Sequence, residues 1–123
     1  MVTSLAEFAR HSLHMTDKIV ILSTCASEQE GEKLARLLVE QRLAACVSLV
    51  PRMRSVYRWK GAIETAEECL LIVKTSRDLF PALCAEMEKL HPYEVPELLA
   101  LPVVAGAENY MSWFQANLRG AEE

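Results

Sequence analysis

The sequence has little glycine, no long hydrophobic run and no excess of basic residues. Glycine occupies only 4 of 123 positions, and no glycine-rich phosphate-binding motif such as GxGxxG occurs, which argues against a nucleotide-binding loop. No apolar run approaches the roughly 20 residues that a helix needs to cross a bilayer. The net charge of −4 argues against general nucleic-acid binding, which depends on Lys and Arg at the phosphates. We therefore expect neither a membrane nor a nucleic acid as a partner.

Cysteine is present, but not in the spacing of a zinc ribbon or a redox motif. The four cysteines form no CxxC pair, and each lies in an apolar stretch; they are Cys25, Cys46, Cys69 and Cys84. We expect no secretory signal peptide before them, because charged residues interrupt the apolar positions of the N-terminal stretch. We expect reduced thiols that act as small core residues in a cytoplasmic protein, with chemistry at Cys25 left open. A composition of 51% hydrophobic and 24% charged residues is that of one folded domain.

The ends of the chain differ from its middle. We expect residues 1–17 to form a flexible N-terminal extension, residues 18–118 a single domain, and residues 119–123 a C-terminal tail. His11 and His14 lie three residues apart in the extension and could share a helical face. Because histidines in such tails are usually solvated, we expect them to bind nothing.

Regular hydrophobic patterns begin after the extension. Residues 19–22 (IVIL) are a short β-branched run, typical of a strand buried on both faces. Ser27 and Glu30 form a capping box and predict the start of a helix. Residues 45–50 predict a second strand. Pro51 marks a sheet edge or a bulge there, because proline cannot donate to a sheet ladder.

The pattern then predicts a hairpin and a second helix. Residues 55–59 alternate as an extended strand, Lys60-Gly61 makes the turn, and residues 63–75 return as a long strand. Ser76 is placed to cap the next helix. The apolar stripe of this helix consists of Leu79, Phe80, Leu83, Met87 and Leu90.

The last part of the chain predicts one more strand and a closing helix. Pro92 and Pro96 force extended backbone, and residues 98–103 predict the final strand. Gly106 opens a helix with inward-facing aromatic and aliphatic residues, namely Tyr110, Trp113, Phe114 and Leu118.

Two strand–helix–strand halves predict the fold class. Right-handed crossovers combine the halves into a four-stranded antiparallel sheet with two helices on one face. We therefore predict an α+β fold, a ferredoxin-like βαββαβ sandwich with an additional C-terminal helix.

The first and third strands are apolar on both faces, which has a consequence for assembly. In the first strand, Ile19 and Ile21 point to one side, and Val20 and Leu22 to the other. Two helices can cover only one face of such a sheet. The other face would expose a large aliphatic patch, which monomers rarely tolerate. We therefore predict a closed homo-oligomer, with the long hairpin available to pair with a neighbour.

Four segments of the sequence together resemble the CutA family of divalent-cation tolerance proteins. They are AACV at residues 44–47, SVYRWKG at residues 55–61, HPYEVPE at residues 91–97 and YMSW at residues 110–113. The resemblance runs from about Lys18 to Leu118. It implies a ferredoxin-like subunit in a stable homotrimer whose sheets face a central axis. It also implies a link to copper and other divalent metal ions, with no organic cofactor and no settled enzymatic reaction.

Three residues are the candidate metal ligands: His91, Cys25 and Glu97. Imidazole, thiolate and carboxylate together suit Cu(II) or Zn(II). His91 also fits a structural role in capping the preceding helix, or acid–base chemistry near neutral pH. Cys25 precedes a helix N-terminus, which lowers thiol pKa values, although it equally fits simple packing. Ser23 stands where a thiol could end the first strand in other family members.

A second set of residues could line a cleft between subunits. It consists of Tyr57, Trp59, Lys74, Tyr93, Glu94 and Trp113. With Glu97, these side chains could bind a small anion or a metal complex. The aromatic residues equally fit anchors of a subunit contact, and Trp113 also fits simple packing.

Two functional hypotheses follow from the sequence. The first is a trimeric divalent-cation tolerance protein that binds copper or another divalent metal ion and is not an enzyme. The second is a non-catalytic signalling or scaffold trimer that binds a small ligand or a partner protein in the clefts between subunits. A weaker third possibility is an enzyme that uses His91 with Glu97.

Overall fold

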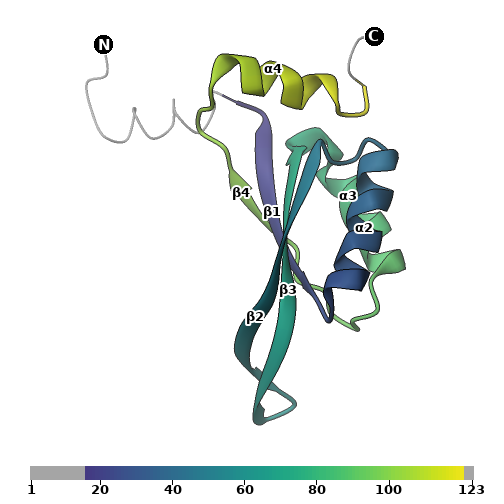
Figure 1. The fold of residues 1–123 in the computed structure, drawn as a ribbon, viewed down its shortest axis with the longest axis vertical. Helices are drawn as coiled ribbons and strands as arrows, with labels where there is room; N and C mark the ends of the chain where they lie inside the picture. The colour runs from purple at the N-terminus through teal and green to yellow at the C-terminus, as the bar shows by residue number, and fades with distance from the viewer. Residues whose placement is uncertain (1–15, 121–123) are drawn as a thin grey trace, which may run out of the picture.

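A computed structural model describes residues 16–120 of the chain as an antiparallel sheet with helices on one face (Figure 1). The strands lie in the order β2-β3-β1-β4, and each neighbouring pair is antiparallel. In chain order the elements are β1 (Lys18–Cys25), α2 (Glu28–Glu40), β2 (Cys46–Trp59), β3 (Ala62–Ser76), the 3-10 turn η1 (Arg77–Leu79), α3 (Phe80–Leu90), β4 (Leu99–Pro102) and α4 (Glu108–Ala116). The predicted α+β class and the additional C-terminal helix are confirmed.

Local signals explain where the two main helices begin. Ser27 caps α2 as predicted, and its Oγ accepts a hydrogen bond from the Glu30 N–H at 3.1 Å. Ser76 does not cap α3, which corrects the prediction: its side chain makes no capping bond, and η1 lies between it and the helix. Proline in the first turn of α3 instead starts the helix, since its missing N–H is not needed there.

The hairpin of β2 and β3 is longer and more regular than predicted. Lys60 and Gly61 turn the chain with φ angles of 50° and 83°, the paired positive values of a tight hairpin turn. The register shifts between Val50 and Met53, and Arg52 within this bulge has a φ of 58°. Pro51 therefore marks both a bulge and an edge strand, as predicted.

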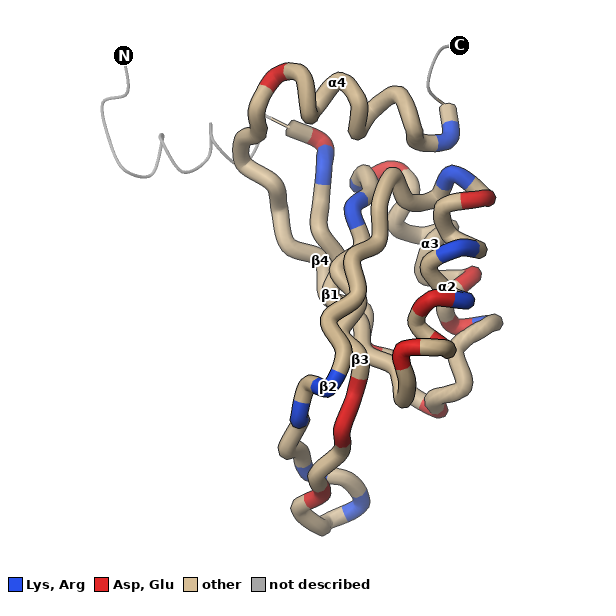
Figure 2. The backbone as a smooth tube through the Cα atoms, in the orientation of Figure 1, with Lys and Arg blue, Asp and Glu red and all other residues tan. Residues whose placement is uncertain are grey.

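The hairpin extends past the rest of the sheet. β1 ends at Cys25, which pairs with Cys69, so the part of β3 before Cys69 has no second neighbour beyond β2. Figure 1 shows this part reaching away from the helices, and Figure 2 shows basic residues along its β2 strand and acidic residues along β3. Opposite charges on paired strands stabilise the pairing.

One face of the sheet forms the core with α2 and α3. Fully or nearly fully buried side chains fill this layer, among them Ile19, Ile21, Leu34, Leu38, Leu71, Val73, Leu83 and Met87. They come from alternate positions of β1 and β3 and from one stripe of each helix. This is the packing that periods of 2 and 3.6 residues predict.

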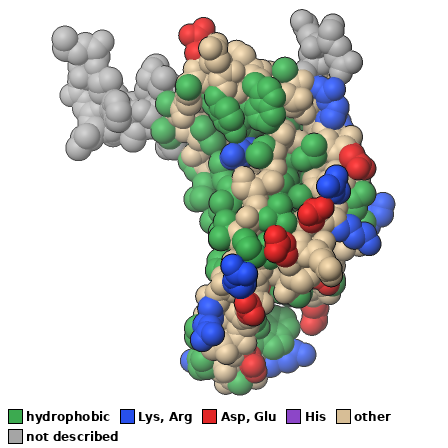
Figure 3. All heavy atoms as spheres, viewed as in Figure 1, with side chains coloured by type: hydrophobic (Ala, Val, Ile, Leu, Met, Phe, Trp, Pro, Cys, Tyr) green, Lys and Arg blue, Asp and Glu red, His purple; other side chains and the backbone are tan. Residues whose placement is uncertain are grey.

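The other face has no helix layer and carries large hydrophobic side chains. Leu22 pairs with both Ile72 and Leu99 in a row across the sheet, and Val20 pairs with Leu101. We name this surface the open face; it includes Val20, Leu22, Val50, Leu70, Ile72, Leu99 and Leu101. Figure 3 shows hydrophobic side chains gathered over the sheet and α4, and charged ones along the helices and the hairpin.

Helix α4 lies across the end of the sheet opposite to the hairpin tip (Figure 1). Phe114 and Leu118 are buried there with Ala45, as predicted. Tyr110 and Trp113 were predicted to face inward, but they are 42% and 46% exposed. A helix that crosses one end of a sheet can bury only one stripe, and the other two aromatic rings remain at the rim of the open face.

Residues 1–15 and 121–123, with His11 and His14, lie outside the described residues. Asp17 belongs to the folded part, because its carbonyl accepts a hydrogen bond of 2.9 Å from the Arg77 N–H. Across residues 16–120, no helix is long and apolar enough to span a membrane.

Candidate functional site

A cavity of about 580 Å³ lies where the hairpin leaves the sheet. We name it the hairpin-root pocket. Its walls come from the end of β1, the two hairpin strands and the loop after α3, and they are formed by Thr24, Ser55, Val56, Tyr57, Trp59, Glu68, Tyr93, Glu94, Val95 and Glu97. The pocket thus joins the YRWKG segment at residues 57–61 and the HPYEVPE segment at residues 91–97, which lie far apart in the sequence.

Most residues of the predicted cleft do meet in this pocket. Tyr57 and Trp59 come from β2, whereas Tyr93 and Glu94 come from the loop after α3. Glu97, predicted as a metal ligand, lines the same cavity. The hairpin strand and the loop therefore build one site that sequence spacing alone could only suggest.

Lys74 and Trp113 do not line the pocket of the single chain, and their place in a cleft between subunits stays a prediction. The Lys74 Nζ lies 3.9 Å from the Cys46 Sγ and 5.8 Å from the centre of the Tyr110 ring. The ring of Trp113 lies 5.6 Å from that of Tyr110. Lys74 is six residues beyond Glu68 on β3, a separation of about 20 Å at roughly 3.3 Å per residue, so both residues sit near the other end of the sheet.

Glu68 is a pocket residue that the sequence reasoning missed. Its side chain is buried, and the Tyr93 hydroxyl donates a hydrogen bond of 2.7 Å to its Oε2. Burial first, and then this carboxyl group, raise the pKa of Tyr93 far above its ordinary value, so the phenol keeps its proton. One signal was available: Glu68 shares the period-2 face of Leu70 and Ile72, which places a carboxyl group at the end of an apolar stripe.

His91 holds the loop after α3 against β1 through both ring nitrogens. The Nε2 atom lies 2.6 Å from the Thr24 carbonyl oxygen, and the Tyr93 backbone N–H donates to Nδ1 at 3.1 Å. A carbonyl requires a donor and an N–H requires an acceptor, so these partners assign the neutral tautomer with the proton on Nε2. The ring also packs 4.7 Å from that of Tyr93. His91 therefore positions one wall of the pocket.

His91 ends α3 with its backbone, and not with its imidazole ring as predicted. Its backbone N–H donates to the Met87 carbonyl at 2.8 Å and ends α3. The ring does not reach back to the last carbonyls of the helix, because it crosses to Thr24 on the neighbouring strand instead.

Cys25 is buried under α2, and its thiol is protonated at neutral pH. Burial first, and then the neighbouring Cys69, raise the pKa of Cys25 to about 11. The Cys25 Sγ donates to the Ser27 carbonyl at 3.3 Å. The prediction that a helix N-terminus lowers this pKa is wrong, because desolvation of the thiolate outweighs the helix dipole.

The three predicted ligands do not form a metal centre within one chain. Among residues 16–120, no group of three or more His, Cys, Asp and Glu side chains is placed to hold a metal ion. The two ring nitrogens of His91 already have partners, Cys25 is buried on the helix side of the sheet, and Glu97 is exposed at the pocket. Joint ligation by this set does not fit the geometry of the single chain.

The charge of the pocket favours a cation over a small anion, which was one of the two kinds of ligand expected from the sequence. Three carboxyl groups line it, those of Glu68, Glu94 and Glu97, and no Lys, Arg or His is among its lining residues. The aromatic rings of Tyr57 and Trp59 line the same cavity. Carboxylate oxygens bind divalent cations, and aromatic faces attract positive charge.

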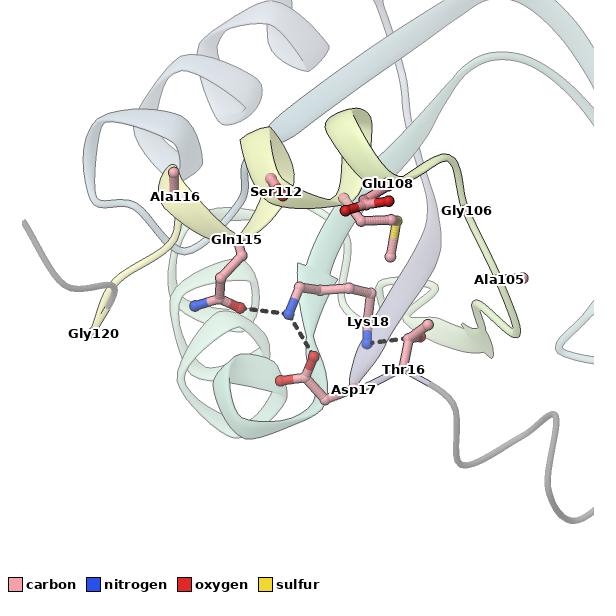
Figure 4. Close-up of a pocket in the computed structure, with 11 residues that line it drawn as sticks. Thr16, Asp17, Lys18, Ala105, Gly106, Glu108, Ser112, Gln115, Ala116 and Gly120 are labelled. Atoms are coloured by element: carbon pink, nitrogen blue, oxygen red, sulfur yellow. Dashed lines mark hydrogen bonds and ion pairs between the residues drawn. The ribbon is translucent and has the colours of Figure 1, made fainter.

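A second cavity, of about 930 Å³, lies between the start of β1 and α4 (Figure 4). The Lys18 Nζ is its one basic group among the lining residues, and it donates to the Asp17 Oδ1 and the Gln115 Oε1. Because both partners satisfy the buried ammonium group, Lys18 ties β1 to α4 and its charge is not free for a ligand.

Comparison with known proteins extends these observations. The chain matches the family model described as "CutA1 divalent ion tolerance protein" over residues 19–117. The divalent-cation tolerance protein CutA of Thermus thermophilus is 46% identical over 98 residues, which are 80% of this chain and 95% of that protein. Human protein CutA is 48% identical over 90 residues, 73% of this chain and 50% of that protein. The chain thus spans about half the length of the mammalian relatives.

Solved structures show the same fold. CutA1 from Oryza sativa superposes with a TM-score of 0.82 at 39% identity, covering 84% of this chain and 94% of that one. The Thermus thermophilus protein gives 0.80 at 44% identity, covering 82% and 98%. Other relatives are described as chloroplastic in Arabidopsis thaliana and periplasmic in Archaeoglobus fulgidus, so family membership does not assign a compartment. Together, the matched residues and the shared fold show that the chain belongs to the CutA1 family of divalent ion tolerance proteins.

Proposed function

We propose that this protein is a homotrimeric, non-catalytic cytoplasmic protein that binds copper(II) or another divalent cation at the hairpin-root pocket. The observation that carries the proposal is the set of three carboxyl groups around a cavity whose lining has no basic side chain. The family description, tolerance to divalent ions, agrees with this chemistry.

The open face supports the assembly. Leu99 and Leu101 are 58% and 47% exposed on a single chain, beside other aliphatic side chains of β1 and β3. Burial of each such side chain is worth about 1.5–3 kcal/mol, so contact with sister chains is strongly favoured. The proposal of three chains, and not another number, rests on the resemblance of the four sequence segments to the CutA family.

Assembly also bears on the metal site. One chain brings no three ligands together among its described residues, and Glu94 and Glu97 are exposed at the rim of the pocket. The pocket adjoins the open face at Thr24, so a neighbouring chain can add further donors. In this arrangement the cation lies between subunits.

Residues around the pocket have distinct parts in this proposal. Glu94 and Glu97 offer carboxylate oxygens to the ion. The buried Glu68 is held by the Tyr93 hydroxyl, and His91 fixes the loop that carries Tyr93. His91 therefore acts on binding by positioning the loop and not as a ligand.

Titration calorimetry with Cu(II) and Zn(II) tests the proposal. We expect saturable binding in the micromolar range, tighter for Cu(II) than for Zn(II) because stability rises toward copper in most donor sets. The double variant Glu94→Gln/Glu97→Gln should weaken binding at least tenfold. Glu40→Gln, an exposed carboxylate at the end of α2, is the matched control and should bind as the unchanged protein does. Absence of saturable binding would remove the metal-binding function.

The same titration separates the two sets of candidate ligands. If His91 and Cys25 were ligands together with Glu97, Cys25→Ala would abolish Cu(II) binding. We expect Cys25→Ala to leave it intact, and His91→Gln to weaken it only through the loop. Native mass measurement of the same samples tests the trimer.

The aromatic wall of the pocket favours a second candidate function, ligand binding in a signalling or scaffold trimer. Tyr57, Trp59 and Tyr93 bring three rings to one cavity, more than a bare metal ion requires. A thermal shift with small organic cations, but none with Cu(II) or Zn(II), would support this function over metal binding.

A further inference from the structure

Two buried thiols lie side by side on neighbouring strands. They are on the helix side of the sheet, away from the hairpin-root pocket. Cys25 is the last residue of β1, and it pairs directly with Cys69 of β3. The two side chains are fully or almost fully buried, and both cysteines are free thiols. We name Cys25 and Cys69 the buried thiol pair.

Both sulfur atoms point to one spot beneath α2. A Cβ atom at Gly31 would lie 3.1 Å from the Cys25 Sγ and 3.3 Å from the Cys69 Sγ. The same atom would lie 3.0 Å from Leu49 Cδ2. A Cβ atom so close to three neighbours would be crowded, so the absence of a side chain at Gly31 lets α2 pack directly against both sulfurs, in apolar surroundings.

The spacing of the pair suits a metal ion bound between two sulfurs. Directly opposite residues in an antiparallel pair have Cβ atoms about 4.5–5.5 Å apart. Metal–thiolate bonds of about 2.3 Å place the sulfurs of a linear two-coordinate complex about 4.6 Å apart. The register of β1 and β3 therefore places the two thiols within the range that such a complex spans.

The two thiols of the buried thiol pair limit which metal ions can bind there. Two thiols are soft ligands, and across the described part of the chain no cluster of three or more metal-binding side chains includes them. Zn(II) normally requires four ligands, and Cu(II) prefers nitrogen and oxygen donors in a plane. A soft monovalent ion with a filled d shell accepts two thiolates alone.

We propose that Cys25 and Cys69 form a second metal site, specific for a soft monovalent cation such as Cu(I). On binding, each thiol loses its proton, and two S–Cu bonds form, so one Cu(I) ion replaces two protons with no change of oxidation state. The complex carries one negative charge, and the N-terminus of α2, which begins three residues after Cys25, favours that charge. This site is independent of the carboxylate pocket proposed for divalent ions.

An anaerobic competition titration tests the site on the full chain. Cu(I) is supplied to the reduced protein in the presence of a chromophoric Cu(I) chelator, and the transfer of metal is measured by absorbance. We expect one Cu(I) per chain. Cys25→Ala and Cys69→Ala should each weaken binding at least 100-fold. The matched control is Cys46→Ala/Cys84→Ala, which removes the other two thiols and should bind as the unchanged protein does.

A third variant keeps both thiols and crowds them from the helix side. Gly31→Ala places a methyl group against both sulfurs, and alanine is otherwise the better residue in a helix. We expect at least tenfold weaker Cu(I) binding, with circular dichroism and native mass showing that the variant folds and assembles.

Three results would overturn the proposal. They are equal Cu(I) binding by Cys25→Ala or Cys69→Ala, loss of binding in the Cys46→Ala/Cys84→Ala control, and a count of two instead of four free thiols in the unfolded anaerobic protein. The last result would show a disulfide where the site requires thiols. Because none of these variants changes the carboxylates of the hairpin-root pocket, the Cu(II) and Cu(I) titrations can fail separately.

Discussion

The two faces of the sheet have similar side chains but different surroundings. On the helix side, Ile21, Leu71 and Val73 are completely buried. On the open face, Leu22 and Ile72 are only partly buried, and Leu101 is nearly half exposed. Strands that are apolar on both sides normally belong to sheets covered on both sides. Within one chain, therefore, helices cover only one of the two apolar faces of the sheet.

The largest expected effect is a loss of stability from a substitution on the covered face, the face of the sheet that packs against α2 and α3. Leu71→Ala should lower the free energy of unfolding by about 2–5 kcal/mol, because it removes a buried side chain and leaves a cavity. Chemical denaturation measures the change. Leu70→Ala, one residue away and on the open face, is the matched comparison. A smaller loss for Leu70→Ala indicates a loosely covered face, whereas an equal loss indicates that sister chains pack against it as tightly as the helices do.

The next largest effect is on assembly. Leu101→Lys puts a charge on the open face and should remove about 1.5–3 kcal/mol of apolar burial per subunit, in addition to the cost of desolvating the ammonium group. Light scattering should then report a smaller particle. Val39→Lys is the control, since Val39 is similarly exposed but lies on α2. An unchanged mass for Leu101→Lys would contradict the role of the open face.

A smaller effect is expected at the hairpin-root pocket. Tyr93→Phe removes the hydroxyl that donates to the buried Glu68, and a net loss of about 1–2 kcal/mol is typical when such a bond is broken. Thermal unfolding measures this loss. The same variant should weaken Cu(II) binding, because the Glu68 carboxyl group is no longer held. No change in either measurement would show that the bond does not organise the pocket.

The smallest effect concerns the covered face at high pH. Burial raises the pKa of the Cys25 thiol from its ordinary 9.0 to about 11, so the folded chain keeps a proton that the unfolded chain releases first. This contribution to stability is complete below pH 9 and is lost as the pH rises toward 11. Urea unfolding across this range should show a shallower decline for Cys25→Ala than for the unchanged protein. Identical declines would contradict the shift.

Much of the fold could be predicted from local patterns. The β-branched run at the start of β1, the Ser27 cap, the Lys60-Gly61 turn and the Pro51 bulge each depend on residues close in the sequence. These signals act through backbone geometry and short-range hydrogen bonds. Ser76 failed as a cap because the proline start of α3 and the intervening 3-10 turn replaced it.

The candidate site was less predictable. The pocket joins the hairpin to the loop after α3, and four of the six residues predicted for a cleft between subunits line this pocket of the single chain; the cleft itself stays a prediction. Lys74 lies away from this pocket, since its distance from the pocket depends on the length of β3. Glu68 was missed, because only the fold shows that the Tyr93 hydroxyl meets it.

The sequence by itself determined the elements, their order and the two apolar faces of the central strands, because these follow from periodicity and from residues near one another in the chain. Only the tertiary structure decided which thiols meet, which nitrogens of His91 are occupied and which charges surround the pocket. Those outcomes depend on strand register and on contacts between distant segments, where a shift of one residue moves a side chain to the opposite face.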